Sequence, residues 1–195
     1  MDQFQTSNPK IKIVYYTHPF CPVSERMQQH WRRLLSDHGH YLSFKFCIAA
    51  SADSACTNAK STFVCQAVKA AELQSPWAAH LFLDAVRTEM AQDRQDLAEA
   101  NVLIEIARTV AKKSPSILDF NRFIEDLDSR RSRQAVLDDL NKLRINRVDQ
   151  LPTLTFTVDG RGLKVTGYKT YHQLLDLMKR VSPAATGINM VGFPQ

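Results

Sequence analysis

The stretch Lys10-Ile-Lys-Ile-Val-Tyr-Tyr-Thr-His-Pro-Phe-Cys-Pro-Val-Ser24 decides the fold of this chain. Residues 10–17 are rich in β-branched and aromatic side chains, which predicts a strand, and Pro22 is typical of a first helical turn. Cys21 therefore lies at the start of a helix, where unpaired backbone N–H groups and the helix dipole favour a thiolate. We expect a reactive thiol at Cys21.

The segments that follow predict a strand, helix and strand unit. Apolar residues recur with a 3.6-residue period to about residue 36, which predicts a helix, and Asp37-His38-Gly39 ends it, with Gly39 in the position past a helix that glycine favours. Apolar and polar residues then alternate over 42–48, which predicts a second strand. Two strands joined by a helix form a βαβ unit, so we expect them to be parallel.

The rest of the chain predicts a helical block and a final ββα unit. Helical periodicity fills residues up to about 146, residues 153–158 alternate strictly, and Asp159-Gly160 is a strong hairpin signal before a returning strand at 163–167 and a helix at 170–181. We therefore predict an α/β, thioredoxin-like fold (βαβ…ββα) with a large all-helical insertion. Residues 10–56 and 148–181 would form a discontinuous thioredoxin-like domain, 57–147 an inserted helical domain, and 182–195 an irregular tail.

Composition restricts the class of protein. The chain has 195 residues, 44% of them hydrophobic, and a net charge of +5, which is ordinary for a globular protein. No run of 18 apolar residues and no secretory signal occur, so we expect a cytoplasmic protein without a membrane partner. The basic residues are dispersed along the predicted helices, which argues against nucleic acid as a partner.

The segment Cys21-Pro-Val-Ser24 predicts chemistry through one thiol. In C-x-x-C proteins the second sulfur resolves the mixed disulfide, and Ser24 stands in its position here. A serine hydroxyl can donate a hydrogen bond to the Cys21 thiolate, but it cannot close a disulfide. An outside thiol such as glutathione would then release the product. The simpler alternative is that Cys21 is an unreactive buried cysteine.

Three further residues complete the expected site together with Pro22. Pro152 stands at the first residue of a predicted strand, and a cis bond before it would turn the Leu151 backbone towards a partner chain. His18 would add positive charge near Cys21, or it is simply an exposed histidine. We expect His18, Pro22, Leu151 and Pro152 to bind the thiol partner.

These segments together resemble the DsbA-like thioredoxin superfamily over roughly residues 10–181. The similarity rests on residues 20–24, 67–74, 148–153 and 164–171, and it is closest to FrnE-type dithiol isomerases and to SpxH-type (YjbH) adapters of the ClpXP protease. The resemblance implies that Cys21 is the nucleophile, that Pro152 is the cis-proline beside it, and that residues 57–147 form the helical cap. Ser24 departs from redox-active members, which have a second cysteine.

The resemblance leaves three hypotheses. The first is a thiol-disulfide oxidoreductase or isomerase, with protein thiols and disulfides or glutathione as partners. The second is a non-enzymatic protein adapter of the ClpXP type, whose partner is another protein. The third is a glutathione-dependent isomerase or transferase, because kappa-class transferases and chromene-carboxylate isomerases share this scaffold with serine in the active position. We favour the enzyme, with no tightly bound cofactor.

The remaining cysteines give no metal site. Cys47, Cys56 and Cys65 are spaced in a way that fits no common zinc pattern. Cys65 lies on an apolar helical stretch and is expected to pack in the core. Cys56, in a polar connection, is the one stand-in for a resolving thiol.

Overall fold

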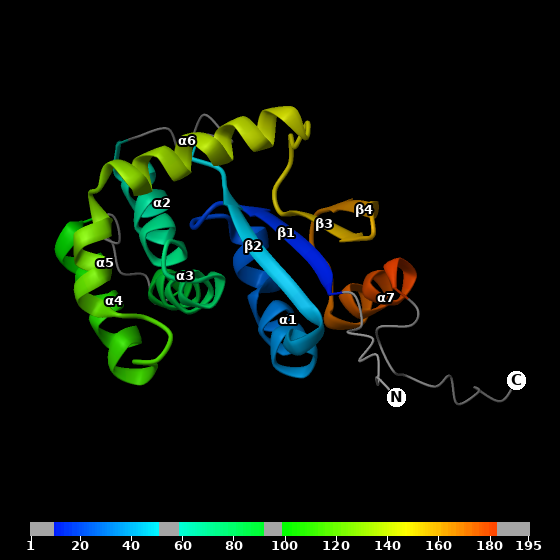
Figure 1. Ribbon diagram of the computed structural model, residues 1–195, viewed down its shortest axis with the longest axis horizontal. Coiled ribbons are helices and arrows are strands. Elements are labelled where there is room, and N and C mark those ends of the chain that lie inside the picture. Colours follow the sequence, from blue (N-terminus) through cyan, green and yellow to red (C-terminus); the bar gives the residue numbers. More distant parts are fainter. Residues whose placement is uncertain (1–9, 51–58, 92–98, 183–195) are drawn as a thin grey trace, which may run out of the picture.

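The computed structural model describes residues 10–50, 59–91 and 99–182 (Figure 1). The expected order βαβ, helical block and ββα is confirmed. Its elements are β1 (Ile11–Thr17), α1 (Pro22–His38), a short 3-10 turn η1 (Gly39–Tyr41), β2 (Leu42–Ile48), α2 (Ala59–Glu72), α3 (Pro76–Ala91), α4 (Ala100–Lys113), α5 (Phe120–Leu127), α6 (Arg130–Ile145), β3 (Thr153–Val158), β4 (Arg161–Thr166) and α7 (Tyr171–Val181). Cys56 and the predicted tail after residue 182 lie outside the described residues.

The strands form one mixed sheet in the order β2-β1-β3-β4. The pair β1 and β2 is parallel, because α1 crosses over between them. β3 runs antiparallel to both β1 and β4. Asp159 and Gly160 both have positive φ angles, 47° and 78°, as a tight hairpin turn of the predicted kind requires. The C-terminal ends of β1 and β2 and the start of β3 therefore lie at the same end of the sheet.

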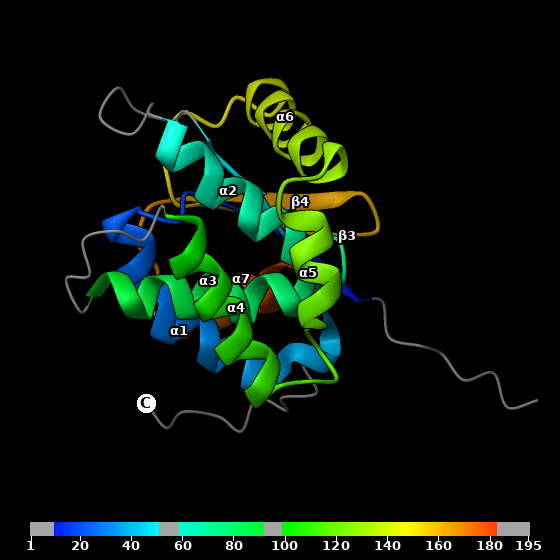
Figure 2. The same cartoon turned by 90° about the vertical axis from the view of Figure 1, so that its left-hand side faces the viewer.

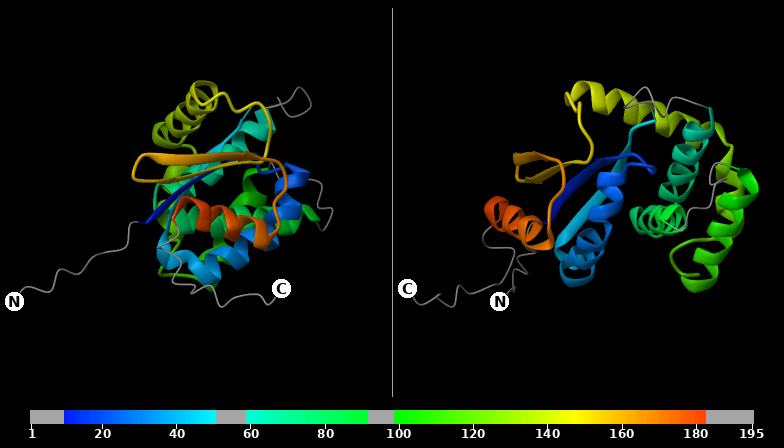
Figure 3. Two further views of the ribbon diagram at one scale, coloured as in Figure 1. Left: turned by 90° about the vertical axis from the view of Figure 1, so that its right-hand side faces the viewer. Right: turned by 180° about the vertical axis from the view of Figure 1, so that it is seen from behind.

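One face of the sheet carries the main core and packs against α1 and α7 (Figure 3). Alternation along the strands directs a set of apolar side chains to this face, where Trp31 of α1 is fully buried against Tyr15 and Phe46. The buried residues of this layer include Ile11, Ile13, Tyr15, Phe44, Phe46, Leu154, Phe156, Leu174 and Met178. The apolar residues that recur along α1 in the sequence are thus the residues of its buried face.

Helices α2 to α5 lie beyond β2, at the opposite end of the molecule from β4 and α7 (Figures 1 and 2). Helix α6 runs back over the other face of the sheet, where Leu143 packs with Tyr16 and Cys47. Apolar side chains of the helical block, α2–α6, belong to the same continuous core as the sheet, including Val68 of α2, Phe82 of α3 and Phe123 of α5. Cys65 is fully buried in this block, as expected. The inserted helices are therefore packed against the sheet through shared core residues.

Polar side chains of the helical block bind the backbone of the edge strand β2. The Phe46 N–H donates to Glu72 Oε1 at 3.0 Å, and the Ile48 N–H donates to Asp139 Oδ2 at 2.9 Å. Lys69 Nζ lies 3.4 Å from the Phe46 carbonyl and 2.7 Å from Asp139 Oδ2, and it also pairs with Glu72. We call Lys69, Glu72 and Asp139 the β2 edge cluster; two helices contribute to it.

The charges of the β2 edge cluster stabilise one another. Lys69 is 4% exposed and Asp139 is fully buried. Burial alone would lower the pKa of Lys69, but the Glu72 and Asp139 carboxylates outweigh it, and the pKa is raised. Because an unpaired buried charge is costly, each member depends on the others.

Gly39 follows the last residue of α1, as the sequence predicted. Its φ and ψ angles are −55° and −28°, in the right-handed region, and it begins the 3-10 turn η1. A Cβ atom at this position would lie 3.2 Å from the Trp77 ring of α3. Gly39 therefore ends α1 without a left-handed conformation, and close packing of α3 is the physical reason for its small size.

Candidate functional site

Cys21 occupies the N-cap position of α1, with φ and ψ angles of −78° and 114°. Its N–H donates to the His18 carbonyl at 3.1 Å, and its carbonyl accepts from the Glu25 N–H at 2.9 Å. Pro22 follows as the first helical residue and is exposed. The free thiol is half-buried. Cys21 thus lies where the backbone N–H groups of a 17-residue helix point.

Ser24 is fully buried beneath the first turn of α1. Its Oγ accepts a hydrogen bond from Thr17 Oγ1 at 2.8 Å. Between Ser24 and Cys21, both described residues, the structure contains no hydrogen bond. Thr17 ends β1, so Ser24 fixes the first turn of α1 to the end of that strand.

His18 is buried, and it is neutral. Its Nδ1 accepts from the Phe20 N–H at 3.1 Å, so the ring proton lies on Nε2, which is 2.8 Å from Ser61 Oγ of α2. Burial and the positive charge of Arg87 lower the pKa of His18 to about 4. The suggestion that His18 supplies positive charge, or that it is simply exposed, is therefore wrong. His18 instead ties the loop before Cys21 to the helical block.

Arg87 supplies the positive charge, and sequence reasoning missed it. This residue of α3 is 1% exposed. Its guanidinium donates to Thr17 Oγ1 at 2.6 Å and to the His18 carbonyl at 3.2 Å, and it also binds the carbonyl of Pro19 and Gln28 Oε1. The His18 carbonyl thus accepts from both Arg87 and the Cys21 N–H.

The electrostatic environment of Arg87 links it to the thiol. Burial lowers the pKa of its guanidinium, whereas Tyr15 and Cys21 act in the opposite direction. A guanidinium stays charged in proteins. Among the described residues, no carboxylate forms an ion pair with Arg87. The cation is therefore directed to the loop that precedes Cys21, where it is compensated by neutral oxygen atoms.

Leu151 and Pro152 lie at the same end of the sheet as Cys21. The register pairs Thr153 with Tyr16, which places Pro152 beside Thr17, and the Leu151–Pro152 peptide bond is cis. Pro152 is buried, and Leu151 is partly exposed. The structure thus brings together the two sequence segments that were expected to form the site.

The other described cysteines are not placed to react. Cys47 is fully buried, and its Sγ donates to the Asp139 carbonyl at 3.4 Å. Burial, with Asp139 next in effect, raises the pKa of Cys47 to about 12. Within the described residues, no group of three or more His, Cys, Asp or Glu side chains could hold a metal ion. None of the described helices is long and apolar enough to cross a membrane.

Comparison with known proteins agrees with this geometry. The family model described as "Thioredoxin" matches residues 15–176, which include both parts of the site. The chain belongs to the thioredoxin family. The match begins within β1 and ends within α7, so the helical block lies inside the family domain as an insertion.

Two solved structures show which arrangement of the thioredoxin fold this is. A putative protein disulfide isomerase from Nitrosomonas europaea superposes with a TM-score of 0.73 at 14% identity, covering 88% of this chain and 97% of that one. The oxidoreductase DsbA from Xylella fastidiosa gives a TM-score of 0.63 at 15% identity, covering 90% and 86%. The thioredoxin-like fold with a DsbA-like helical insertion is therefore confirmed.

The sequence relatives are named as adapter proteins, whereas the solved structures are named as a disulfide isomerase and an oxidoreductase. The ClpXP adapter protein SpxH of Halalkalibacterium halodurans is 33% identical over 116 residues, which span 58% of this chain and 36% of the relative. SpxH of Shouchella clausii is 25% identical over an alignment of 224 residues, spanning 95% of this chain and 73% of that protein. The thioredoxin family assignment is thus supported by relatives of two kinds.

Proposed function

We propose that this thioredoxin-family chain carries out thiol–disulfide exchange through Cys21 alone. The observation that carries the proposal is the position of Cys21 at the N-terminus of α1, with the buried guanidinium of Arg87 bound to the preceding loop. Both features favour a thiolate, which is the reactive form of cysteine. Ser24 occupies the buried position three residues later, where it cannot act as a resolving thiol.

The reaction would proceed by two exchanges. The Cys21 thiolate attacks one sulfur of a substrate disulfide, a new S–S bond joins Cys21 to that sulfur, and the other sulfur leaves as a thiolate that takes a proton from water. A thiolate from solution then attacks the substrate sulfur, and Cys21 is released as a thiolate. No net oxidation of the protein occurs, so no oxidant is needed.

The surrounding residues suggest how the partner binds. The half-exposed Leu151, before Pro152, lies beside the end of β1, where the backbone of an extended peptide could pair with it. His18 holds the loop through Ser61, and Pro22 begins the helix beneath the thiol. Glutathione is the proposed outside thiol, and the cytoplasm is the compartment that supplies such thiols.

Alkylation of the native protein tests this proposal. Iodoacetamide at pH 6, followed by peptide mapping, should modify Cys21 at least about tenfold faster than cysteine in the urea-unfolded chain, because thiolates react and thiols do not. Cys21→Ser should abolish mixed-disulfide formation with a disulfide-bonded peptide. A rate for native Cys21 no higher than that of the unfolded chain would exclude the proposal.

The relatives support a second candidate function, that of a protein adapter. SpxH proteins are named as ClpXP adapters, and the alignment with the Shouchella clausii protein extends over 95% of this chain. An adapter would bind its partners through surface residues of the helical block. Binding of the purified chain to ClpXP should then survive Cys21→Ala. A complete loss of binding in that variant would favour the thiol function instead.

A further inference from the structure

A groove runs along α1, between α3 of the helical block and the segment that joins β4 to α7. Its volume is about 630 Å³, within the range of small-ligand sites. The groove is lined by Glu25, Arg26, Gln28, Gln29, Arg32, Arg87, Thr88, Ala91 and Tyr168. Glu25 follows Cys21 by one helical turn, which is about 6 Å along the axis. The groove therefore begins one helical turn after Cys21, which is not itself part of the lining.

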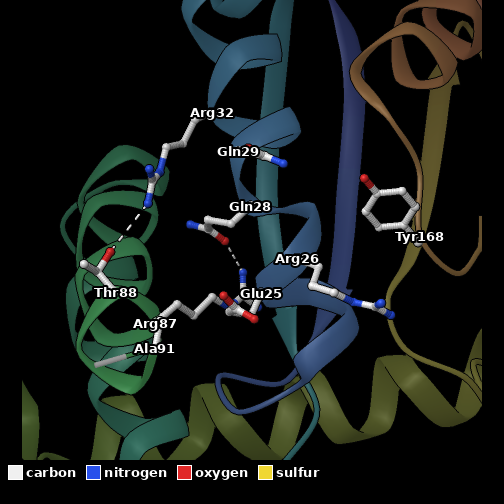
Figure 4. Close-up of a pocket in the computed structure, with 9 residues that line it drawn as sticks. All are labelled: Glu25, Arg26, Gln28, Gln29, Arg32, Arg87, Thr88, Ala91 and Tyr168. Atoms are coloured by element: carbon white, nitrogen blue, oxygen red, sulfur yellow. Dashed lines mark hydrogen bonds between the residues drawn. The ribbon is translucent and has the colours of Figure 1, made fainter. Parts of the chain in front are cut away.

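The charges in the groove are arranged on two sides of α1. Figure 4 shows Arg26 and Tyr168 on one side, Arg87 and Thr88 on the other, and Glu25 between them. Within the described part of the chain, Arg26 and Glu25 form no ion pair or side-chain hydrogen bond. Both side chains are thus available to a ligand. The buried Arg87 instead anchors α3, which forms the opposite side of the groove.

Two of the remaining wall residues fix the position of the groove. Arg32 pairs with Asp84 of α3, so its charge is compensated. Tyr168 receives or donates a hydrogen bond with His30 Nε2 at 2.6 Å, which orients its ring at the rim. Arg87 is 1% exposed and is bound to the loop before Cys21, so Arg26 and Glu25 are the charged groups of the lining, among the described residues, that a ligand can reach unpaired. A guanidinium and a carboxylate on adjacent residues suit a ligand that carries both a carboxylate and an ammonium group.

We propose that this groove binds an anionic thiol peptide of the glutathione type as the second substrate of the exchange reaction. Such a peptide has a carboxylate at each end, and one of them suits the unpaired Arg26 guanidinium. It also has an ammonium group, which suits Glu25. The inference rests on the proposed function, because the peptide thiolate attacks the Cys21 mixed disulfide, forms a disulfide with the substrate sulfur and releases the Cys21 thiolate.

The kinetic test compares two thiols of different charge. In a Cys56→Ser background, Cys21 is converted to its pyridyl mixed disulfide, and release of thiopyridone by glutathione and by neutral β-mercaptoethanol is followed. The glutathione rate should saturate and should exceed that of β-mercaptoethanol, after normalisation to a small pyridyl disulfide. Arg26→Gln should lower the ratio of the two rates by about fivefold. Arg33→Gln, an exposed arginine of α1 outside the groove, should leave the ratio unchanged.

A binding measurement separates this inference from the function it rests on. S-methylglutathione has the same charges and no free thiol, so calorimetry with it does not require Cys21 chemistry. Binding that is weakened by Arg26→Gln and by Glu25→Gln, but not by Arg33→Gln, would support the groove. Failure of Cys21 to form any mixed disulfide would overturn the proposed function and the second-substrate role. A normal Cys21 reaction without S-methylglutathione binding, or equal effects of the two arginine variants, would overturn the inference alone.

Discussion

Replacing Asp139 by asparagine should destabilise the protein by about 3 kcal/mol. Asp139 is fully buried, accepts from the Ile48 N–H and pairs with Lys69 Nζ at 2.7 Å. Removing one partner from a buried ion pair costs about 3–5 kcal/mol. Asparagine keeps an acceptor for Ile48, and Lys69 keeps Glu72 as a partner, so the lower end of that range applies. Lys142, which is 41% exposed, adds little because it can turn to water.

Urea unfolding at neutral pH measures this loss. With a slope of about 2 kcal/mol per molar urea, the midpoint of Asp139→Asn should fall by about 1.5 M relative to the wild type. Asp138→Asn is a matched control, because Asp138 is the preceding residue of α6 and is exposed. That control should stay within about 0.5 kcal/mol of the wild type. Equal midpoints for the two variants would refute the reasoning about the β2 edge cluster.

Three other predictions concern the site. Ser24→Cys should allow a disulfide with Cys21, because residues three apart at a helix start lie within disulfide range; a mass unchanged by oxidation would contradict this. His18 and His80 are buried with pKa values lowered to about 4. Since the unfolded chain alone takes up these protons, stability is complete above about pH 6.5 and should fall towards pH 4 by up to about 3 kcal/mol per histidine. Urea midpoints at several pH values check this, and His80→Phe should remove about half of the slope. Arg87→Met should slow alkylation of Cys21 at pH 7 by about tenfold, because the nearby cation is lost; an unchanged rate would show that Arg87 has a packing role only.

Local patterns were sufficient to predict most of the fold. Alternation located the strands, and Asp159-Gly160 located the hairpin, because these features depend on neighbouring residues. The same holds for Cys21, whose position follows from a strand that runs into a proline-started helix. The extent of α1 to His38, beyond the expected end near residue 36, is a small error of the same local kind.

The partners that distant segments bring to the site could not be predicted in this way. Arg87 is charged, and only its spacing from the apolar residues Leu83 and Val86 of α3 hinted that it faces inward. Its role depends on how α3 packs against α1, which no local pattern contains. The neutral state of His18 depends in the same way on burial by α2 and on Arg87. Sequence reasoning therefore found the thiol and missed its electrostatic environment.

The β2 edge cluster also determines how copies of this protein could associate. A sheet grows by strand addition only where backbone N–H and carbonyl groups are free, and on β2 two N–H groups and one carbonyl are already bound to helix side chains. The other edge strand, β4, is largely exposed. The edge at β2 is closed and the edge at β4 is open. If two copies joined through their β4 strands, the combined sheet would end in a β2 strand on both sides, so a third copy could not be added. The helical insertion therefore limits the growth of the sheet by strand addition to two copies, and this effect does not depend on Cys21.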